Sequence, residues 1–90
     1  MATEEEIKDR LKSEGYTQII EYKDPANEIF ADHDHPGDEL LIVVSGSIAI
    51  SMGGKEHNLA AGDELFFPAK QTHSATIGPE GCFYIVGEKE

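Results

Sequence analysis

Residues 33–45, HDHPGDELLIVVS, join a histidine-rich stretch to the most apolar run of the chain. If residues 39–45 form a strand, alternate side chains point to opposite faces, so Leu41 and Val43 share a face with Glu39. The other face is apolar as well and carries Leu40, Ile42 and Val44. A sheet with one wet face would alternate instead, so we expect this outer face to be covered, either by an N-terminal helix or by a second subunit.

Short β-prone runs separated by Gly, Pro, Asn and Asp fill the chain after residue 16. Residues typical of turns lie between these runs, in SGS at 45–47, GG at 53–54, AGD at 61–63 and GPEG at 78–81. Eight short strands in one small domain favour an all-β sandwich or barrel. We expect the strands at residues 17–23, 27–33, 39–45, 47–52, 55–60, 64–67, 73–78 and 82–88.

The first residues carry the signals of a short α-helix. Thr3 is a good N-cap, and Glu6 three residues later completes a capping box. Gly15 fits the C′ position at the other end. Because Ile7 and Leu11 form only a narrow apolar stripe, we expect the helix to cover the barrel and not to form its core.

The length of 90 residues suits a single domain. We place this barrel domain at residues 16–90, after a capping helix at residues 1–15. A chain of this length buries only a modest share of its surface when it folds. Because LFF at 65–67 and FYIV at 83–86 are also apolar on both faces, we predict that the protein is a homodimer.

The composition excludes several kinds of partner. With 7 Lys+Arg against 18 Asp+Glu the net charge is −11, and without a basic cluster neither nucleic acid nor an anionic membrane is expected to bind. The acidic start is unlike a signal peptide, and no apolar run approaches the roughly 20 residues that cross a bilayer, so we expect a cytoplasmic protein. Cys82 is the single cysteine, which excludes an internal disulfide and a cysteine-rich zinc site. Any metal would therefore have to use histidines and carboxylates.

Two histidines and a carboxylate precede the apolar strand. On an extended strand His33 and His35 project from the same face, close enough to bind one ion, while Asp34 points to the opposite side. Glu39 returns to the first face if the bend between them preserves the register. An isolated HxH is also compatible with an exposed polar loop, and the lone His73 downstream with an ordinary surface or core histidine.

Together these two segments resemble the paired motifs of the cupin type-2 conserved barrel family. The first motif, Gx5HxHx3-4Ex6G, is matched by His33, His35, Glu39 and Gly46, with Asn27 in place of the leading glycine.

The second motif, Gx5PxGx2Hx3N, is matched by Gly62, Pro68 and His73. Lys70 replaces the inner glycine and Ile77 the final asparagine. The resemblance covers residues 27–77, and its departures concern turn geometry while all four metal-ligand positions are filled.

The resemblance implies a small jelly-roll β-barrel whose lumen holds one divalent metal ion, bound here by His33, His35, Glu39 and His73. Iron, manganese, nickel, cobalt, copper and zinc all suit such nitrogen-rich ligands. An octahedral ion would keep two open positions for a small oxygenated substrate, as in a dioxygenase, isomerase or lyase. A tetrahedral zinc would be saturated, so the alternative is a non-catalytic cupin with a structural metal or a bound small ligand.

Alternation also predicts the apolar residues around the ion. Tyr84 is a weak catalytic candidate, because its phenol could donate a hydrogen bond to a ligand or act as an acid. Lys70 is placed near the barrel mouth, and Cys82 is interpreted as a small buried apolar residue. The expected lumen residues are Leu41, Val43, Ile50, Phe67, Ala75 and Tyr84.

Overall fold

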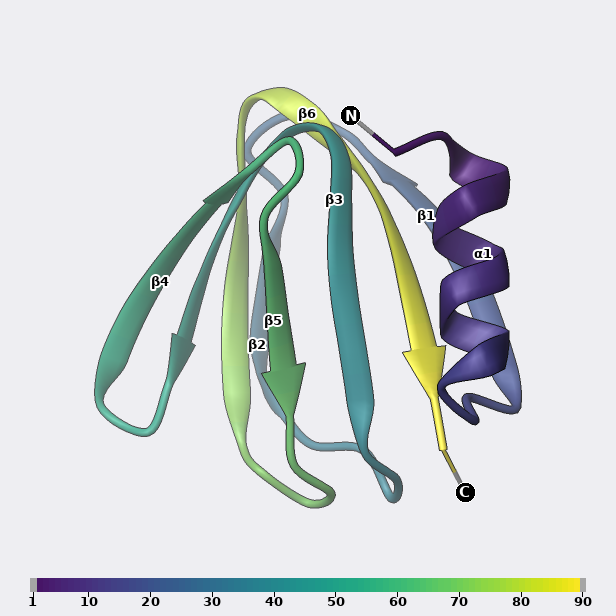
Figure 1. Cartoon of the computed structure of the whole chain (residues 1–90). Helices are drawn as coiled ribbons and strands as arrows, with labels where there is room; N and C mark the ends of the chain where they lie inside the picture. Colours follow the sequence, from purple (N-terminus) through teal and green to yellow (C-terminus); the bar gives the residue numbers. More distant parts are fainter. Residues whose placement is uncertain (1, 90) are drawn as a thin grey trace.

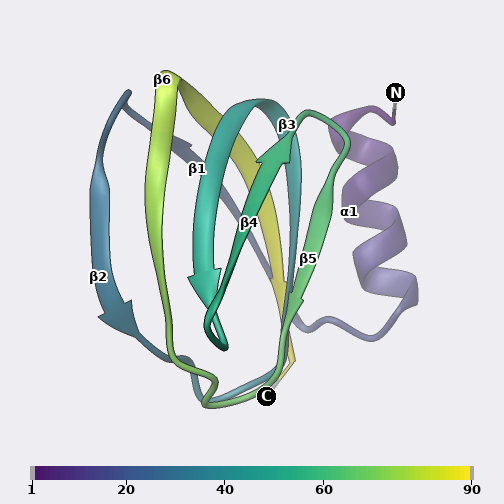
Figure 2. The same cartoon turned by 90° about the vertical axis from the view of Figure 1, so that its left-hand side faces the viewer.

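The computed structural model of the chain describes residues 2–89. One helix lies outside an all-β jelly-roll barrel, as Figure 1 and the view turned by 90° in Figure 2 show, and the predicted fold class is confirmed. The elements are α1 (Glu4–Ser13), β1 (Gln18–Asp24), β2 (Ile29–His33), β3 (Glu39–Met52), β4 (Lys55–Ala60), β5 (Glu64–Phe67) and β6 (His73–Glu88).

The strands form two layers that share the two long strands, β3 and β6. One layer contains, in order, β1, residues 82–88 of β6, residues 39–46 of β3, and β5. The other contains β2, residues 73–77 of β6, residues 47–52 of β3, and β4. All neighbouring strands are antiparallel, so side chains that face the space between the layers alternate with outward ones.

Two of the predicted turns are wrong, because SGS at 45–47 and GPEG at 78–81 lie inside β3 and β6. Both long strands bend there together, with Gly46 opposite Cys82. Gly46 has a φ of 77°, and a Cβ atom at this position would lie 2.1 Å from the carbonyl oxygen of Gly81. This close approach requires glycine and allows both strands to pass from one layer into the other.

Helix α1 begins and ends as its sequence predicts. The N–H of Glu6 donates to Thr3 Oγ1 (3.2 Å), and the N–H of Thr3 donates to a Glu6 carboxylate oxygen (3.0 Å), which completes the capping box. At the other end Gly15 has a φ of 92°, and the N–H of Tyr16 donates to the carbonyl oxygen of Leu11 (3.1 Å). This is the hydrogen bond of a Schellman cap.

The apolar outer face of the first layer is covered by α1. Arg10 holds the helix in place through two hydrogen bonds to the Glu64 carboxylate (2.6 and 2.9 Å). Gly87 leaves room for it, since a Cβ atom there would lie 3.0 Å from a methyl carbon of Leu11. The chain thus covers most of this face by itself, but Phe66 on β5, opposite Leu40, stays 46% exposed. The argument for a second subunit is weaker than the sequence suggests, and the homodimer stays a prediction. The buried residues of this cluster are Ile7, Leu11, Tyr16, Leu40, Ile42 and Ile85.

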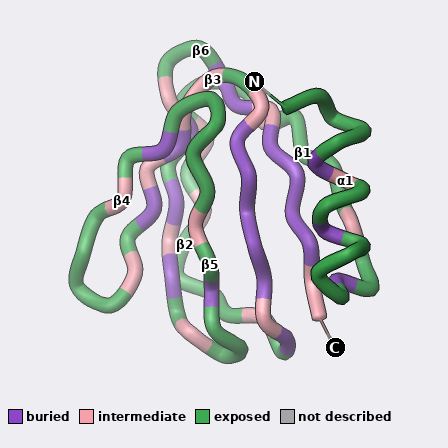
Figure 3. The backbone as a smooth tube through the Cα atoms, viewed as in Figure 1, coloured by how far each residue is buried: buried purple, intermediate pink, exposed green. Residues whose placement is uncertain are grey.

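A second apolar cluster fills the space between the layers. Figure 3 shows the buried residues along β3 and β6, whereas most of the connecting segments are exposed. The cluster contains Leu41, Val43, Ile48, Ile50, Leu59, Phe67, Ala75, Ile77, Cys82, Tyr84 and Val86. Within residues 2–89 no helix has the length and apolar character needed to cross a bilayer.

Candidate metal centre

The predicted ligands gather at one end of the barrel. Strands β2 and β5 end there, β3 begins there, and β6 both begins and ends there, as Figure 1 shows. The loops at residues 34–38 and 68–72 are tied together at this end. The N–H of Lys70 donates to the carbonyl oxygen of His35 (2.7 Å), and the N–H of Ala69 donates to an Asp38 carboxylate oxygen (2.8 Å). The two motifs of the sequence are therefore in direct contact.

Three imidazole rings from two segments of the chain meet in this region. The ring centroids of His33 and His73 lie 4.4 Å apart, and that of His35 lies 5.1 and 5.3 Å from them. One ring nitrogen from each lies within 4.8 Å of the other two, a spacing that a single ion can bridge. A register shift between Phe30 and His33 turns His33 toward its partner His73 on β6. His35 lies just beyond the end of β2, which ends at His33 as the predicted strand does.

Hydrogen bonds to the backbone determine which ring nitrogen of His33 and of His73 is free to bind a metal ion. Nδ1 of His33 lies 2.7 Å from the carbonyl oxygen of Ala31, and Nδ1 of His73 lies 3.1 Å from that of Gln71. Because a carbonyl oxygen only accepts, each Nδ1 carries the proton and each Nε2 keeps a free lone pair. Backbone carbonyls orient metal-binding histidines in this way.

Burial lowers the pKa of two of these imidazoles and so favours their neutral form. It lowers the pKa of His35, with the charge of His33 as the next cause. It also lowers the pKa of His73, against the opposing effect of the backbone hydrogen bond to Gln71. The Phe67 ring stacks on His73 with centroids 4.5 Å apart and holds it in place. Neutral imidazole is the form that binds metal ions.

Glu39 lies at the side of the imidazole group and not within it. Its side chain is 8% exposed, and its Oε2 atom lies 3.2 Å from Nδ1 of His35. Its carboxylate belongs to a second group, in which donor atoms of His35, Glu39 and Glu88 lie within 4.8 Å of one another. Burial, then the charge of Glu88 and a hydrogen bond to it, raise the pKa of Glu39 to about 7. The structure therefore joins the three predicted histidines directly and Glu39 through His35.

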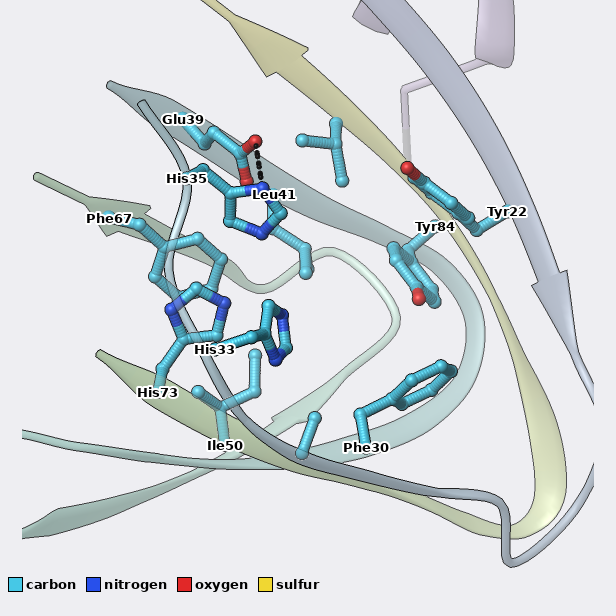
Figure 4. A pocket seen from close by; sticks show the side chains of 12 residues that line it. Tyr22, Phe30, His33, His35, Glu39, Leu41, Ile50, Phe67, His73 and Tyr84 are labelled. Atoms are coloured by element: carbon cyan, nitrogen blue, oxygen red, sulfur yellow. Dashed lines mark ion pairs between the residues drawn. The ribbon is translucent and has the colours of Figure 1, made fainter. Parts of the chain in front are cut away.

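A pocket of about 200 Å³ opens beside the imidazoles, as Figure 4 shows. Val43, one of the expected lumen residues, belongs to the buried core and does not line it. The predicted residues that do line it are Leu41, Ile50, Phe67, Ala75 and Tyr84, together with the proposed ligands. The residues that the sequence reasoning missed are Tyr22, Phe30 and Val86.

Tyr84 is held by an acidic partner. Its hydroxyl donates to Asp24 Oδ2 at 2.5 Å, and its ring stacks on that of Tyr22 with centroids 5.2 Å apart. Burial, followed by this hydrogen bond, raises the pKa of Tyr84 far above its usual range. The phenol therefore keeps its proton at neutral pH, and its catalytic role stays a prediction. Burial likewise raises the pKa of the Cys82 thiol to about 11, so this cysteine is not a thiolate nucleophile.

Glu88 is the polar residue that the sequence reasoning missed. It stands directly opposite Glu39 in the pairing of β6 with β3. The sequence contains a signal for this residue, because Tyr84, Val86 and Glu88 occupy alternate positions of one strand and their side chains therefore share its inner face.

Comparison with known proteins gives consistent results. Residues 21–86 match the family model described as "Cupin domain". Nitrosourea synthase of Streptomyces achromogenes subsp. streptozoticus is 34% identical over 64 residues, which cover 70% of this chain and 14% of that protein. Dimethylsulfoniopropionate lyase DddW of Ruegeria pomeroyi is 31% identical over 55 residues, 61% of this chain and 36% of that protein. The chain thus spans only a minor part of each curated relative.

A solved structure has the same architecture. An RmlC-like cupin from Shewanella frigidimarina aligns with a TM-score of 0.72 at 24% sequence identity, covering 79% of this chain and 63% of that one. At this level of identity the likeness shows the fold alone.

Proposed function

This chain belongs to the cupin domain family, and on that basis we propose that it binds one divalent metal ion through His33, His35, His73 and Glu39. The ion would then hold a small oxygenated ligand or substrate in the adjoining pocket. The observation that carries this proposal is the convergence of three imidazoles, two of which are fixed with Nε2 free by backbone carbonyls.

The donors suit a transition metal. Imidazole nitrogens with one carboxylate favour zinc, iron, manganese, cobalt, nickel or copper over magnesium and calcium, which prefer oxygen. A bound ion of this kind would supply Lewis-acid polarisation of a ligand oxygen or, if redox-active, chemistry with dioxygen. Three neutral imidazoles and one carboxylate leave the centre with one net positive charge, which attracts an anionic or strongly polar oxygen ligand.

The pocket limits what can bind there. Its volume of about 200 Å³ lies below the range of roughly 300–1,000 Å³ usual for drug-sized ligands, so a compact molecule is favoured. No Lys or Arg lines it among the described residues, so the oxygen donor of the ligand would face the metal end. Tyr22, Phe30 and Tyr84 supply aromatic surface that excludes water from the other end, around a ligand whose remaining part is apolar.

We favour a metal-dependent enzyme of dioxygenase, isomerase or lyase type. A synthase and a lyase among the relatives support this choice, although each match covers a minor part of the relative. The second candidate is a non-catalytic cupin whose metal is structural or supports ligand binding. The small pocket favours it, as does the engagement of the Tyr84 hydroxyl with Asp24.

Metal content tests the proposal. Protein purified without added metal should contain close to one divalent ion per chain by elemental analysis, and His73→Ala should lose it. His57→Ala is the matched control, because His57 is half-buried on β4 and belongs to neither donor group. Unchanged metal content and melting temperature in His73→Ala would contradict the ligand assignment. Iron or copper would favour the enzyme, and stoichiometric zinc with no exchangeable water the structural role.

We also propose that the protein is cytoplasmic and forms a homodimer. A monomeric elution volume at micromolar concentration would contradict the dimer.

A further inference from the structure

Asp38 links the two motifs to each other and to the last strand of the barrel. Its carboxylate oxygen Oδ1 accepts the N–H of Ala69 (2.8 Å), in the loop that joins β5 to β6 in Figure 1. Its carbonyl oxygen accepts the N–H of Lys89 (2.8 Å), which directly follows β6. The backbone of Asp38 is thus fixed to the barrel, while its side chain holds a loop.

The loop that Asp38 holds is a tight turn with two outward N–H groups. The N–H of Gln71 donates to the carbonyl oxygen of Pro68 (3.1 Å), which closes the turn. Lys70 at its third position has a φ of 64°, and no other residue of the turn has a positive φ. This pattern defines a type II turn, in which the second and third N–H groups take no part in the closing hydrogen bond. Both of these groups donate to residues of the first motif.

The same turn orients the imidazole of His73. The carbonyl oxygen of Gln71, the last residue of the turn, lies 3.1 Å from Nδ1 of His73 and leaves Nε2 of that ring free. The ring of Phe67 stacks on His73 with centroids 4.5 Å apart. A shift of the turn would therefore move the carbonyl group that directs His73 toward His33 and His35.

The hydrogen bond to Ala69 is the contact in which the Asp38 carboxylate is used. This side chain is half-buried, and in the part of the chain that the structure describes it forms no ion pair with Lys or Arg. A carboxylate binds a backbone N–H more strongly than a neutral oxygen does. The bond joins the segment that carries His35 and Glu39 to the segment that carries His73. The relative position of these ligands therefore depends on one side chain.

We propose that Asp38 is a positioning residue of the metal centre, whose hydrogen bond to Ala69 fixes the turn that directs His73 toward the other two histidines. This inference rests on the metal-binding function proposed above. Asp38 belongs to neither group of donor atoms found among the described residues. Its effect on the ion passes through the turn and His73, as the contacts of residues outside a ligand set usually do.

Titration of the metal-free protein with Co²⁺, in competition with a chelator, measures affinity, and the visible absorption spectrum reports the ligand geometry. Asp38→Ala should lose roughly 10-fold to 100-fold in Co²⁺ affinity, as removal of a residue that orients a ligand typically does. Asp38→Asn should stay within about three-fold of the wild type and keep its spectrum, because the amide oxygen accepts the same N–H. Asp34→Asn is the control for lost charge, since Asp34 is exposed between His33 and His35, and it should bind Co²⁺ as the wild type does.

A second variant removes the same hydrogen bond from the side of the turn. Ala69→Pro deletes the N–H but keeps the turn, because proline favours the second position of a type II turn. It should weaken Co²⁺ binding about as much as Asp38→Ala does. In the Ala69→Pro background, Asp38→Ala should change the affinity by less than about two-fold, because the bond between the two residues is already absent.

NMR of the metal-free protein tests the orientation of His73 independently of metal affinity. The ring of Phe67, stacked on His73, shifts the resonances of the His73 ring protons. Asp38→Ala should move these resonances, whereas Asp38→Asn should leave them in place. The ring protons of His57, which lies on β4 and in neither donor group, should keep their resonances in both variants.

Several results would overturn the inference. Equal losses of affinity in Asp38→Asn and Asp38→Ala would show an effect of charge, and additive losses in the double variant would show that the bond to Ala69 is not the cause. Unmoved His73 resonances in Asp38→Ala would show that the turn does not depend on this side chain. A wild type that binds Co²⁺ while Asp38→Ala binds it equally well removes the inference alone. A wild type that binds no Co²⁺ removes the proposed function and this inference together.

Discussion

Lys70 occupies a backbone conformation that glycine adopts more easily, and its replacement should stabilise the protein. It lies between β5 and β6 with a φ of 64°, in the left-handed region. The motif of the family has glycine at this position. Its N–H donates to the carbonyl oxygen of His35 (2.7 Å), so the loop must keep this conformation to meet the first motif. Lys70→Gly retains that hydrogen bond and relieves the strain.

The expected gain follows from two opposing effects. A residue with a Cβ atom pays about 1–2 kcal/mol for the left-handed conformation, whereas glycine loses about 0.5–1 kcal/mol more entropy when the chain folds. The net stabilisation is therefore about 0.5–1 kcal/mol. In a domain of this size that corresponds to a rise in melting temperature of about 2–8 °C.

Urea denaturation of the metal-free protein measures this gain, with two further variants as controls. Lys70→Ala removes the same exposed side chain but keeps the strain, so its stability should equal that of the wild type. Asn27→Gly should gain less, because Asn27 has the same conformation, with a φ of 65°, and asparagine tolerates it. If Lys70→Gly were no more stable than Lys70→Ala, backbone strain at this position would not be the cause.

Three further predictions concern the site, the bend and the cover. Burial and a neighbouring carboxylate raise the pKa of Glu39 from 4.5 to about 7, so stability from the neutral form is complete below pH 4.5 and lost as pH rises through 7. At 1.36 kcal/mol per pH unit, the wild type loses at most about 3 kcal/mol of stability in this way. Metal-free Glu39→Gln should therefore be more stable than the wild type in urea at pH 8 and equally stable at pH 4.5. Equal stability of the two proteins at pH 8 would contradict this. Gly46→Ala places a Cβ atom 2.1 Å from the Gly81 carbonyl oxygen and should lower the stability by more than about 2 kcal/mol in thermal denaturation. Gly53→Ala, which has open space around it, should lower it by about 1 kcal/mol. Similar losses in the two variants would refute the steric explanation. Leu11→Ala, at a fully buried position, should lower the stability in urea by about 3 kcal/mol. Its metal content should not change, because α1 packs on the outer face of the barrel. A folded Leu11→Ala variant without metal would contradict this.

Local signals predicted the parts of the fold that depend on neighbouring residues. Thr3 and Gly15 mark the ends of the helix because caps act within one turn. The β-prone runs locate the strands, but of the eight expected strands two pairs are joined, in β3 and in β6, so that the structure has six. The sequence predicts turns at Gly46 and Gly81, where the structure has bends within β3 and β6, because composition cannot distinguish a loop from a bend held by cross-strand pairing. The same limit applies to the cover of the outer face, since the sequence alone leaves a helix and a second subunit equally open.

The candidate metal centre likewise combines features that the sequence predicts with features that it does not. The match of His33, His35 and His73 to the family motifs was sufficient to predict that their side chains lie together. The bulge that turns His33 inward and the contact of Glu88 with Glu39 depend on the register between distant strands. That register is fixed by the whole barrel, so it could not be inferred from either motif alone.

The pairing of β3 with β6 also affects how the protein acquires its site. Glu39 meets Glu88 in the last strand of the barrel, so the carboxylate side of the centre forms only when sequence-distant segments have joined. Domains dominated by such non-local pairing have high contact order and fold in about milliseconds to seconds, slower than helical domains. During that interval the chain exposes both apolar faces of β3, a surface prone to aggregation. Because both groups of donor atoms join residues that are far apart in the sequence, we expect metal uptake by a refolding chain to report closure of the barrel.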